Sequence, residues 1–185
     1  MDLILASQSP RRSELLRTAG IPFRLRVRPV EERRAPGEAP AAYAIRLARE
    51  KAEAAWESSV NEIVLGADTI VVLGERVLEK PSDAADAIEM LQALSGREHT
   101  VITGFCLRHP AGAISDSEST QVRFAKLDPA EIDAYVASGE PMDKAGAYAI
   151  QGLASKFVER IDGCYFNVMG LPVAKIYRLW KTLVF

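Results

Sequence analysis

Two neighbouring arginines at the start of a helix are the first residues of this 185-residue chain that point to chemistry. The segment 7–12 reads Ser-Gln-Ser-Pro-Arg-Arg, and Ser9 and Pro10 are typical of the N-cap and first turn of a helix. A helix N-terminus is partially positive, so it repels Arg11 and Arg12 by roughly 0.3–1 kcal/mol each. A bound anion turns this repulsion into attraction, because backbone N–H and guanidinium groups then converge on phosphate oxygens. The segment therefore indicates a phosphate site, with solvated arginines as the alternative.

An acidic residue interrupts the most apolar stretch of the chain. Residues 63–73 are dense in Val, Ile and Leu, but Gly66, Asp68 and Thr69 lie in their middle. A carboxylate buried in such a strand is costly unless it is paired, hydrogen-bonded or bound to a metal. In α/β folds, a carboxylate at the end of a central strand often faces the ligand crevice. We therefore favour a functional Asp68 over the alternative that Gly66 marks a bulge or a strand end and Asp68 points to solvent.

Two lysines and a glutamine in loop segments extend the candidate site. Lys80 precedes a proline, and Lys144 opens a run of small residues that would let a ligand approach the backbone closely. Gln151 offers both a donor and an acceptor, as the reading of a nucleobase edge requires. Each alone is more often an ordinary surface residue. Together with the two arginines they favour a polyanionic ligand.

Composition excludes several classes of protein. With 48% hydrophobic and 26% charged residues the chain is an ordinary globular one, and its net charge of −2 disfavours a general nucleic-acid binder. Arg24, Arg26 and Arg28 alternate along one segment, without the aromatic residues of a nucleic-acid stripe, so we interpret them as the solvated face of a strand.

Cysteine and histidine usage excludes further kinds of site. The two cysteines, Cys106 and Cys164, form no metal or redox motif, and two histidines without a nucleophile motif disfavour a His-rich metal centre or a hydrolase triad. The apolar run at the N-terminus is too short for a signal peptide, and no run reaches the roughly 20 residues of a membrane span. These features predict a soluble cytoplasmic protein.

Helical and strand patterns alternate along the chain, which predicts an α/β protein. Strands are expected at 2–6, 23–27, 63–73, 99–108, 114–125 and 157–161, with a hairpin turn at 74–75. Helices are expected at 11–19, 41–57, 129–138 and 172–184, and in a segment that Ser82 caps and Gly96 ends. Asp128 and Glu131 suggest a capping box, and Tyr177 is expected on the inward face of the last helix. Without a repeat or a linker, residues 1–185 are expected to form a single domain.

Five motifs together resemble one known family. Their order is that seen in Maf proteins, and the match runs from about Leu3 to Pro172: Leu5–Arg12, Gly66–Thr69, Glu79–Pro81, Asp143–Tyr148 and Gly170–Pro172. The resemblance implies a nucleoside triphosphate pyrophosphatase that needs a divalent cation, Mg²⁺ or Mn²⁺. Such an enzyme cleaves between the α and β phosphates and releases a monophosphate and pyrophosphate. The implied fold is an elongated mixed β-sheet flanked by helices, with two lobes and a central cleft, similar to inosine-triphosphate pyrophosphatases. The resemblance also implies that the protein assembles as a homodimer.

The resemblance carries site roles to individual positions. Asp68 matches the proposed proton acceptor, which is also a candidate metal ligand, and Glu32 matches an acidic position near the metal. The residues on the phosphate side are Ser7, Arg11, Arg12, Lys51 and Lys80. Lys144, from the fourth motif, is a further substrate-binding candidate.

Three positions distinguish branches of the family. Arg11, Thr69 and Gln151 resemble the dTTP/UTP branch, because the 7-methyl-GTP branch tends to carry Trp, Gln and Glu there. A glutamine also suits uracil or thymine, whose edge offers an N–H donor between carbonyl acceptors. Ala149 and Cys164 depart from the glycine and serine common in the family, which affects pocket shape rather than chemistry.

We therefore expect hydrolysis of dTTP and UTP, and of modified pyrimidine nucleotides as a broader activity. The partner is a nucleoside triphosphate substrate, with neither a nucleic acid polymer nor a membrane. The alternatives are the 7-methyl-GTP branch and a nucleotide-binding regulator of cell division with little catalysis. Intact Asp68 and Lys80 argue against the regulator.

Overall fold

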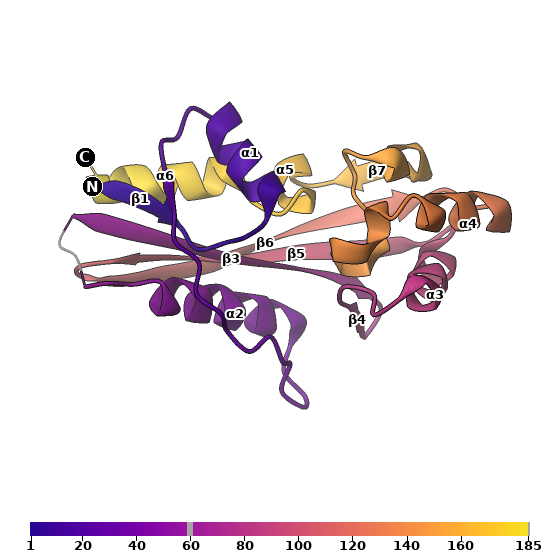
Figure 1. Ribbon diagram of the computed structural model, residues 1–185, viewed down its shortest axis with the longest axis horizontal. Coiled ribbons are helices and arrows are strands. Elements are labelled where there is room, and N and C mark those ends of the chain that lie inside the picture. The colour runs from indigo at the N-terminus through magenta and orange to yellow at the C-terminus, as the bar shows by residue number, and fades with distance from the viewer. Residues whose placement is uncertain (59–60, 185) are drawn as a thin grey trace. The chain divides into compact units, whose positions relative to one another are not determined.

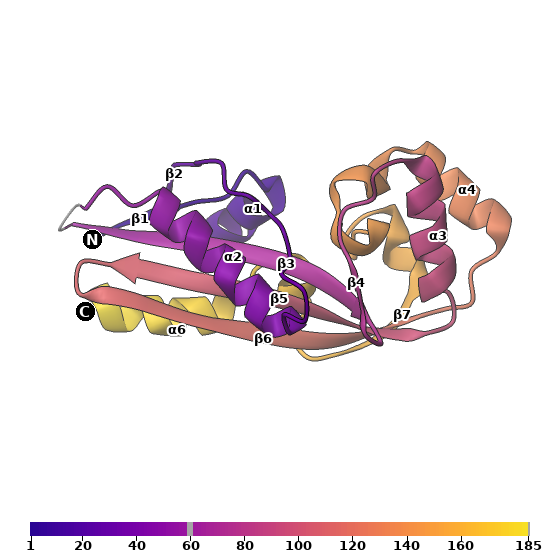
Figure 2. The same cartoon turned by 90° about the horizontal axis from the view of Figure 1, so that it is seen from below.

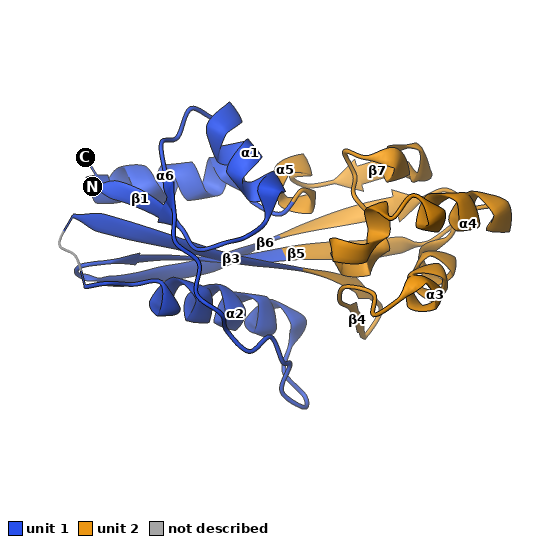
Figure 3. Cartoon of the chain, in the orientation of Figure 1, with its two compact units in different colours: residues 1–69, 103–118, 170–185 blue, residues 70–102, 119–169 orange. Residues whose placement is uncertain are grey.

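The computed structural model describes residues 1–58 and 61–184, which divide into two compact units (Figure 3). Unit 1 contains residues 1–69, 103–118 and 170–185, and unit 2 contains residues 70–102 and 119–169. The three longest strands contribute residues to both units.

Within the described residues the strands form one seven-stranded sheet (Figure 1). They are β1 (Asp2–Leu5), β2 (Arg24–Leu25), β3 (Glu62–Leu73), β4 (Arg76–Leu78), β5 (Glu98–His109), β6 (Gly112–Phe124) and β7 (Val158–Asp162). The order is β2-β1-β3-β5-β6-β7, with β4 paired to β3. Strand β1 runs parallel to β2 and β3, whereas the β3–β4 and β6–β7 pairs are antiparallel. The expected mixed sheet is confirmed, including the hairpin between β3 and β4.

Helices cover this sheet in both units. They are α1 (Pro10–Thr18), α2 (Pro40–Ala54), α3 (Ala84–Leu94), α4 (Pro129–Ala137), α5 (Tyr165–Val168) and α6 (Val173–Val184), with 3₁₀ turns η1 (Glu140–Asp143), η2 (Ala145–Ala147) and η3 (Leu153–Phe157). In unit 1, α2 lies on one face of the sheet and α1 and α6 lie on the other (Figures 1 and 2). In unit 2, α3 packs against α4 over a core that includes Leu91, Phe124 and Phe157. None of the helices in the described part of the chain is long and apolar enough to cross a membrane.

Two glycines let α2 contact the sheet backbone to backbone. A Cβ atom built at Gly66 would lie 2.0 Å from the carbonyl oxygen of Ala48, and one at Gly104 would lie 2.4 Å from that of Ala44. Strand β3 continues without a break through residues 66–69, so Gly66 marks close helix packing and not the bulge considered as an alternative. These contacts determine how far α2 lies from β3 and β5.

The residue that caps a helix in the structure is not always the one that the sequence suggests first. Asp83 caps α3, where Ser82 was expected, and its carboxylate accepts a hydrogen bond from the Asp86 N–H. A carboxylate is favoured there because it also complements the helix dipole. Ser9 occupies the N-cap position of α1, but its side chain makes no capping hydrogen bond. The expected capping box of Asp128 and Glu131 is confirmed.

Two further expectations are wrong in detail. The strand expected at 23–27 is reduced to two residues, because prolines at 22 and 29 interrupt its ladder. Tyr177 was expected to face inward but is 42% exposed, while Ile176 is buried. Its ring packs beside Trp180 at the edge of the apolar face, where the hydroxyl group stays in water. Gly96 follows the end of α3 as expected, with a left-handed φ of +66°.

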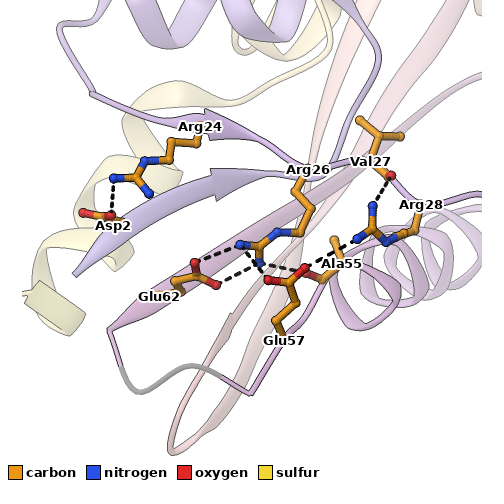
Figure 4. Close-up of polar contacts among 8 residues, drawn as sticks. All are labelled: Asp2, Arg24, Arg26, Val27, Arg28, Ala55, Glu57 and Glu62. Atoms are coloured by element: carbon orange, nitrogen blue, oxygen red, sulfur yellow. Dashed lines mark hydrogen bonds and ion pairs between the residues drawn. The ribbon is translucent and has the colours of Figure 1, made fainter.

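The alternating arginines of the edge segment are neutralised by acidic neighbours (Figure 4). Arg26 makes a two-pronged contact with Glu62, at 2.8 and 2.9 Å. Arg24 forms an ion pair with Asp2 at 3.1 Å, and Arg28 forms one with Glu57 at 3.4 Å. Paired in this way, these arginines do not form the unbalanced basic stripe that binds nucleic acid.

Candidate functional site

Arg12 connects three segments of unit 1 through its guanidinium group. The side chain extends from the first turn of α1 and is only 8% exposed. Nε donates to the carbonyl oxygen of Gly170 at 2.8 Å, Nη1 to Ser7 Oγ at 2.9 Å and Nη2 to Thr69 Oγ1 at 2.9 Å. The loop after β1, strand β3 and the turn before α6 therefore meet on one cation.

This arrangement fixes two hydroxyl groups of the predicted site. Ser7 Oγ also accepts from the Ser9 N–H at 3.2 Å, and Thr69 Oγ1 lies 2.9 Å from Thr103 Oγ1. Burial lowers the pKa of Arg12 and the Asp68 carboxylate opposes that shift, but an arginine stays protonated in either case. Three of its five N–H donors go to protein oxygens. Arg12 is thus a fixed positive charge whose role at the phosphates remains a prediction.

A lysine on α2 joins the two predicted acidic residues. Lys51 Nζ lies 2.7 Å from Asp68 Oδ1 and 2.6 Å from Glu32 Oε1. Asp68 is 8% exposed in the middle of β3, so the alternative of a solvent-directed carboxylate is wrong. The partner that a buried carboxylate needs is Lys51, and the approach of α2 at Gly66 brings it there.

The donors around Lys51 fit a divalent cation. Asp68 and Glu32 offer hard carboxylate oxygens of the kind that Mg²⁺ and Mn²⁺ prefer. Across residues 1–58 and 61–184, no three His, Cys, Asp or Glu side chains gather as a ready-made metal site. A cation bound by one or two carboxylates completes its shell with water and substrate phosphate oxygens, as Mg²⁺ usually does in nucleotide enzymes.

The remaining predicted residues are distributed over the two units. Arg11 is half-buried in the first turn of α1, within unit 1. Lys80 is exposed just after β4 in unit 2, where the neighbouring Glu79 carbonyl accepts from the Gly146 N–H at 3.0 Å. Lys144 Nζ donates to the Glu140 carbonyl and to Asp143 within its own loop. The structure brings Ser7, Thr69 and Arg12 together, and Glu32, Lys51 and Asp68 together.

Sequence reasoning missed several residues around these groups. Thr103 is fully buried in β5 against Thr69, and a hydroxyl inside an apolar strand was its available signal. The Gly170 carbonyl binds Arg12, a role that no side-chain pattern reveals. Tyr135 and Glu140 contact the segment around Gln151, and no motif pointed to them.

Comparison with known proteins agrees with these motifs. A family model described as Maf-like protein matches residues 2–183. A dTTP/UTP pyrophosphatase of Koribacter versatilis is 53% identical over 181 residues, which are 98% of this chain and 94% of that protein. One from Aquifex aeolicus is 45% identical over 183 residues, covering 99% and 96%.

Two solved structures are similar in fold at low sequence identity. The Ham1 protein of Staphylococcus aureus has a TM-score of 0.50 and 16% identity, covering 85% of this chain and 91% of that one. The HAM1 protein of Coxiella burnetii also has a TM-score of 0.50, with 13% identity and coverage of 98% and 99%. Since the family model spans nearly the whole chain and the curated relatives match it at about half of all positions, the chain belongs to the Maf family.

Proposed function

We propose that this protein is a dTTP/UTP pyrophosphatase that cleaves its substrates between the α and β phosphates. The observation that carries the proposal is the buried Asp68 beside Lys51 and Glu32, in a chain whose full-length relatives bear that name. A carboxylate kept inside a strand at this cost is typical of a residue selected for chemistry. The products are a nucleoside monophosphate and pyrophosphate.

Asp68 takes the proton of the water that attacks the α-phosphorus. Lys51 orients the carboxylate through its 2.7 Å contact with Oδ1, which leaves the other oxygen to accept that proton. In the alternative role of Asp68, it and Glu32 would hold a divalent cation, Mg²⁺ or Mn²⁺, which would activate the water and supply positive charge for the phosphate oxygens. The bond that breaks joins the α-phosphorus to the bridging oxygen, which leaves with pyrophosphate.

Cationic side chains stabilise the charge that develops on the leaving pyrophosphate. Arg11, Arg12, Lys51 and Lys80 are the residues proposed for this role, and Ser7 adds a hydroxyl group. Three contacts with the protein hold the Arg12 guanidinium group in place, so the side chain needs little rearrangement when the substrate binds. Lys51 has an ammonium group with three donors, so it can contact a phosphate oxygen while it still orients Asp68.

Gln151 is proposed to read the pyrimidine, with Thr69 and Lys144 as further substrate contacts. The Gln151 side chain is exposed, so its amide is available to a ligand. Its carbonyl accepts from the ring N–H of uracil or thymine while its NH₂ group donates to a neighbouring carbonyl. Cytosine lacks that N–H donor, so it should be a poorer substrate.

The test is a pyrophosphate-release assay with Mg²⁺ or Mn²⁺ on UTP, dTTP, CTP, ATP, GTP and 7-methyl-GTP. We expect preferential release from UTP and dTTP, and a loss of at least about 100-fold in Asp68→Asn. Glu31→Gln is the matched control, because Glu31 is an exposed carboxylate next to Glu32. Release only from 7-methyl-GTP would overturn the branch. Binding of nucleotides without any release would favour the regulator of cell division.

We also propose that residues 1–185 act as one domain, as a homodimer in the cytoplasm. Strands β3, β5 and β6 each contribute to both units, which supports one inseparable domain. Nucleoside triphosphates are cytoplasmic metabolites, which supports the location. Light scattering after size-exclusion chromatography tests the dimer, since a mass near the 20.2 kDa of one chain would overturn it.

A further inference from the structure

The segment that bears Gln151 is bound on both sides by one pair of side chains in unit 2. Two residues before Gln151, the Ala149 N–H donates to Tyr135 Oη at 3.3 Å. Two residues after it, the Leu153 N–H donates to Glu140 Oε2 at 3.1 Å. Tyr135 Oη in turn donates to Glu140 Oε1 at 2.9 Å, so the two side chains form one connected support. We call them the Tyr135–Glu140 pair.

Gly152 brings the backbone of this segment directly onto the Glu140 carboxylate. A Cβ atom at Gly152 would lie 2.4 Å from Glu140 Oε1 and 2.5 Å from Oε2. Any other residue type at this position would therefore displace the Glu140 carboxylate from its present place. The glycine next to Gln151 favours the contact through its lack of a side chain, since its φ of −101° is open to any residue.

The pair is itself held rigidly. Tyr135 is 3% exposed, and its ring packs edge-on against Phe157 with centroids 5.5 Å apart. Burial and the neighbouring Glu140 carboxylate raise the pKa of Tyr135, so its hydroxyl remains a donor to Glu140. Lys144 Nζ binds the Glu140 backbone carbonyl at 2.5 Å. The result is an exposed Gln151 on a backbone that the buried Tyr135 holds on one side and the half-buried Glu140 holds on the other.

We propose that Tyr135 and Glu140 are positioning residues that set nucleotide selectivity by fixing the backbone of Gln151. The inference rests on the proposed function, because it assumes that Gln151 reads the base. Selection of uracil over cytosine depends on a donor and an acceptor aimed in a fixed direction, since a mobile amide can rotate to suit either base. Tyr135 and Glu140 touch no reacting atom in this account.

The experiment measures kcat/KM for UTP and CTP in Tyr135→Phe, Glu140→Gln and Gly152→Ala. We expect the UTP-to-CTP ratio to fall about fivefold to tenfold, the equivalent of one oriented hydrogen bond, mainly through KM for UTP. Tyr165→Phe and Glu159→Gln are the matched controls, because both residues are exposed in unit 2. If Tyr135→Phe does not fold, Glu140→Gln keeps the test, since it is isosteric.

A double-mutant cycle separates positioning from general destabilisation. In a Gln151→Ala background, Glu140→Gln should cause no further loss of selectivity, because Glu140 acts only through Gln151. Amide hydrogen exchange at Ala149 and Leu153 should be faster in the Tyr135→Phe and Glu140→Gln variants. Faster exchange with an unchanged UTP-to-CTP ratio would overturn the inference, as would additive losses in the cycle. A wild-type protein that does not distinguish UTP from CTP would instead overturn the proposed function, and the inference with it.

Discussion

Arg12 shows how a residue expected to bind a ligand also organises the protein around it. Its guanidinium group donates to Gly170, Ser7 and Thr69 from an almost fully buried position. The planar fork of an arginine matches three acceptors in three directions, which a lysine ammonium on a flexible stem does not reproduce. Loss of Arg12 therefore affects folding and catalysis together.

We expect Arg12→Lys to lower the free energy of unfolding by about 3 kcal/mol, since a buried cation loses part of its hydrogen bonding. Activity should fall by about tenfold or more, because Ser7 and Thr69 lose a common partner. Urea unfolding and UTP turnover measure the two effects. Arg17→Lys, on the exposed side of the same helix, is the control. Full stability in Arg12→Lys would contradict this account.

Because His99 is buried, we expect the free energy of unfolding to depend on pH. Its ring is 2% exposed, Nε2 lies 2.9 Å from Tyr148 Oη, and burial lowers its pKa to about 4. His99 binds a proton near pH 6.5 in the unfolded chain but only near pH 4 in the folded protein. Its contribution to the free energy of unfolding is therefore fully present above pH 6.5 and is lost as the pH falls from 6.5 to 4. Between pH 6.5 and pH 4 the free energy of unfolding should fall by about 3 kcal/mol through His99.

Urea unfolding at pH 7 and at pH 4.5 measures the effect. His99→Gln, which keeps a polar partner for Tyr148, should have a flatter pH dependence than wild type. His109→Gln is the control, because His109 is the last residue of β5 and is less buried than His99. An equal slope in wild type and His99→Gln would assign the pH dependence to other groups.

At the scale of elements, the distance between α2 and the sheet determines whether Lys51 can contact Asp68 in unit 1. Gly66 and Gly104 allow backbone contact, and Lys51 reaches Asp68 from the last turn of that helix. The atoms that a new Cβ would meet at Gly104 are the Ala44 carbonyl and the Ile45 nitrogen. Backbone atoms cannot be trimmed by a second substitution, so the helix itself must move.

Gly104→Ala should displace α2, cost about 2 kcal/mol of stability and reduce turnover by moving Lys51 away from Asp68. Ala44→Gly should not rescue it, because the clash is with backbone. Gly74→Ala is the control: its turn has a φ of +61° and open space, so it should lose about 1 kcal/mol of stability and keep its activity. Normal turnover in Gly104→Ala would separate α2 from the chemistry.

Patterns within one segment were predictable, and contacts between distant segments were not. The apolar run of β3 predicted a strand, and its lone acid predicted a paired carboxylate, but nothing local identified Lys51, 17 residues earlier, as the partner. The Asp128 capping box depends on four consecutive residues and was correct. Tyr135 and Glu140 act on a segment up to 14 residues away through backbone N–H groups, which carry no side-chain signature.

At the scale of the whole molecule, charge is balanced locally as well as in total. The net charge is −2, and the edge arginines are paired with acidic residues. The two candidate metal ligands already share an ammonium group, so the fold is electrostatically satisfied around Asp68 without a further cation. A metal is thus expected to serve substrate binding and catalysis rather than folding.

Chelation with EDTA should therefore abolish pyrophosphate release and leave the melting temperature of the nucleotide-free protein unchanged within about 1 °C. Mg²⁺ or Mn²⁺ should restore turnover. Differential scanning calorimetry with and without chelator measures the melting temperature. A drop of several degrees would instead indicate a structural metal.

The division of the chain has a consequence for biosynthesis. Unit 2 contains no residue beyond 169, whereas unit 1 also needs the later residues 170–185. During synthesis, all residues of unit 2 are therefore available before unit 1 is complete. The Arg12 bond to Gly170 and the cover that α6 provides form only afterwards. A nascent chain thus carries Asp68 long before the residues that complete unit 1 around it have been synthesised.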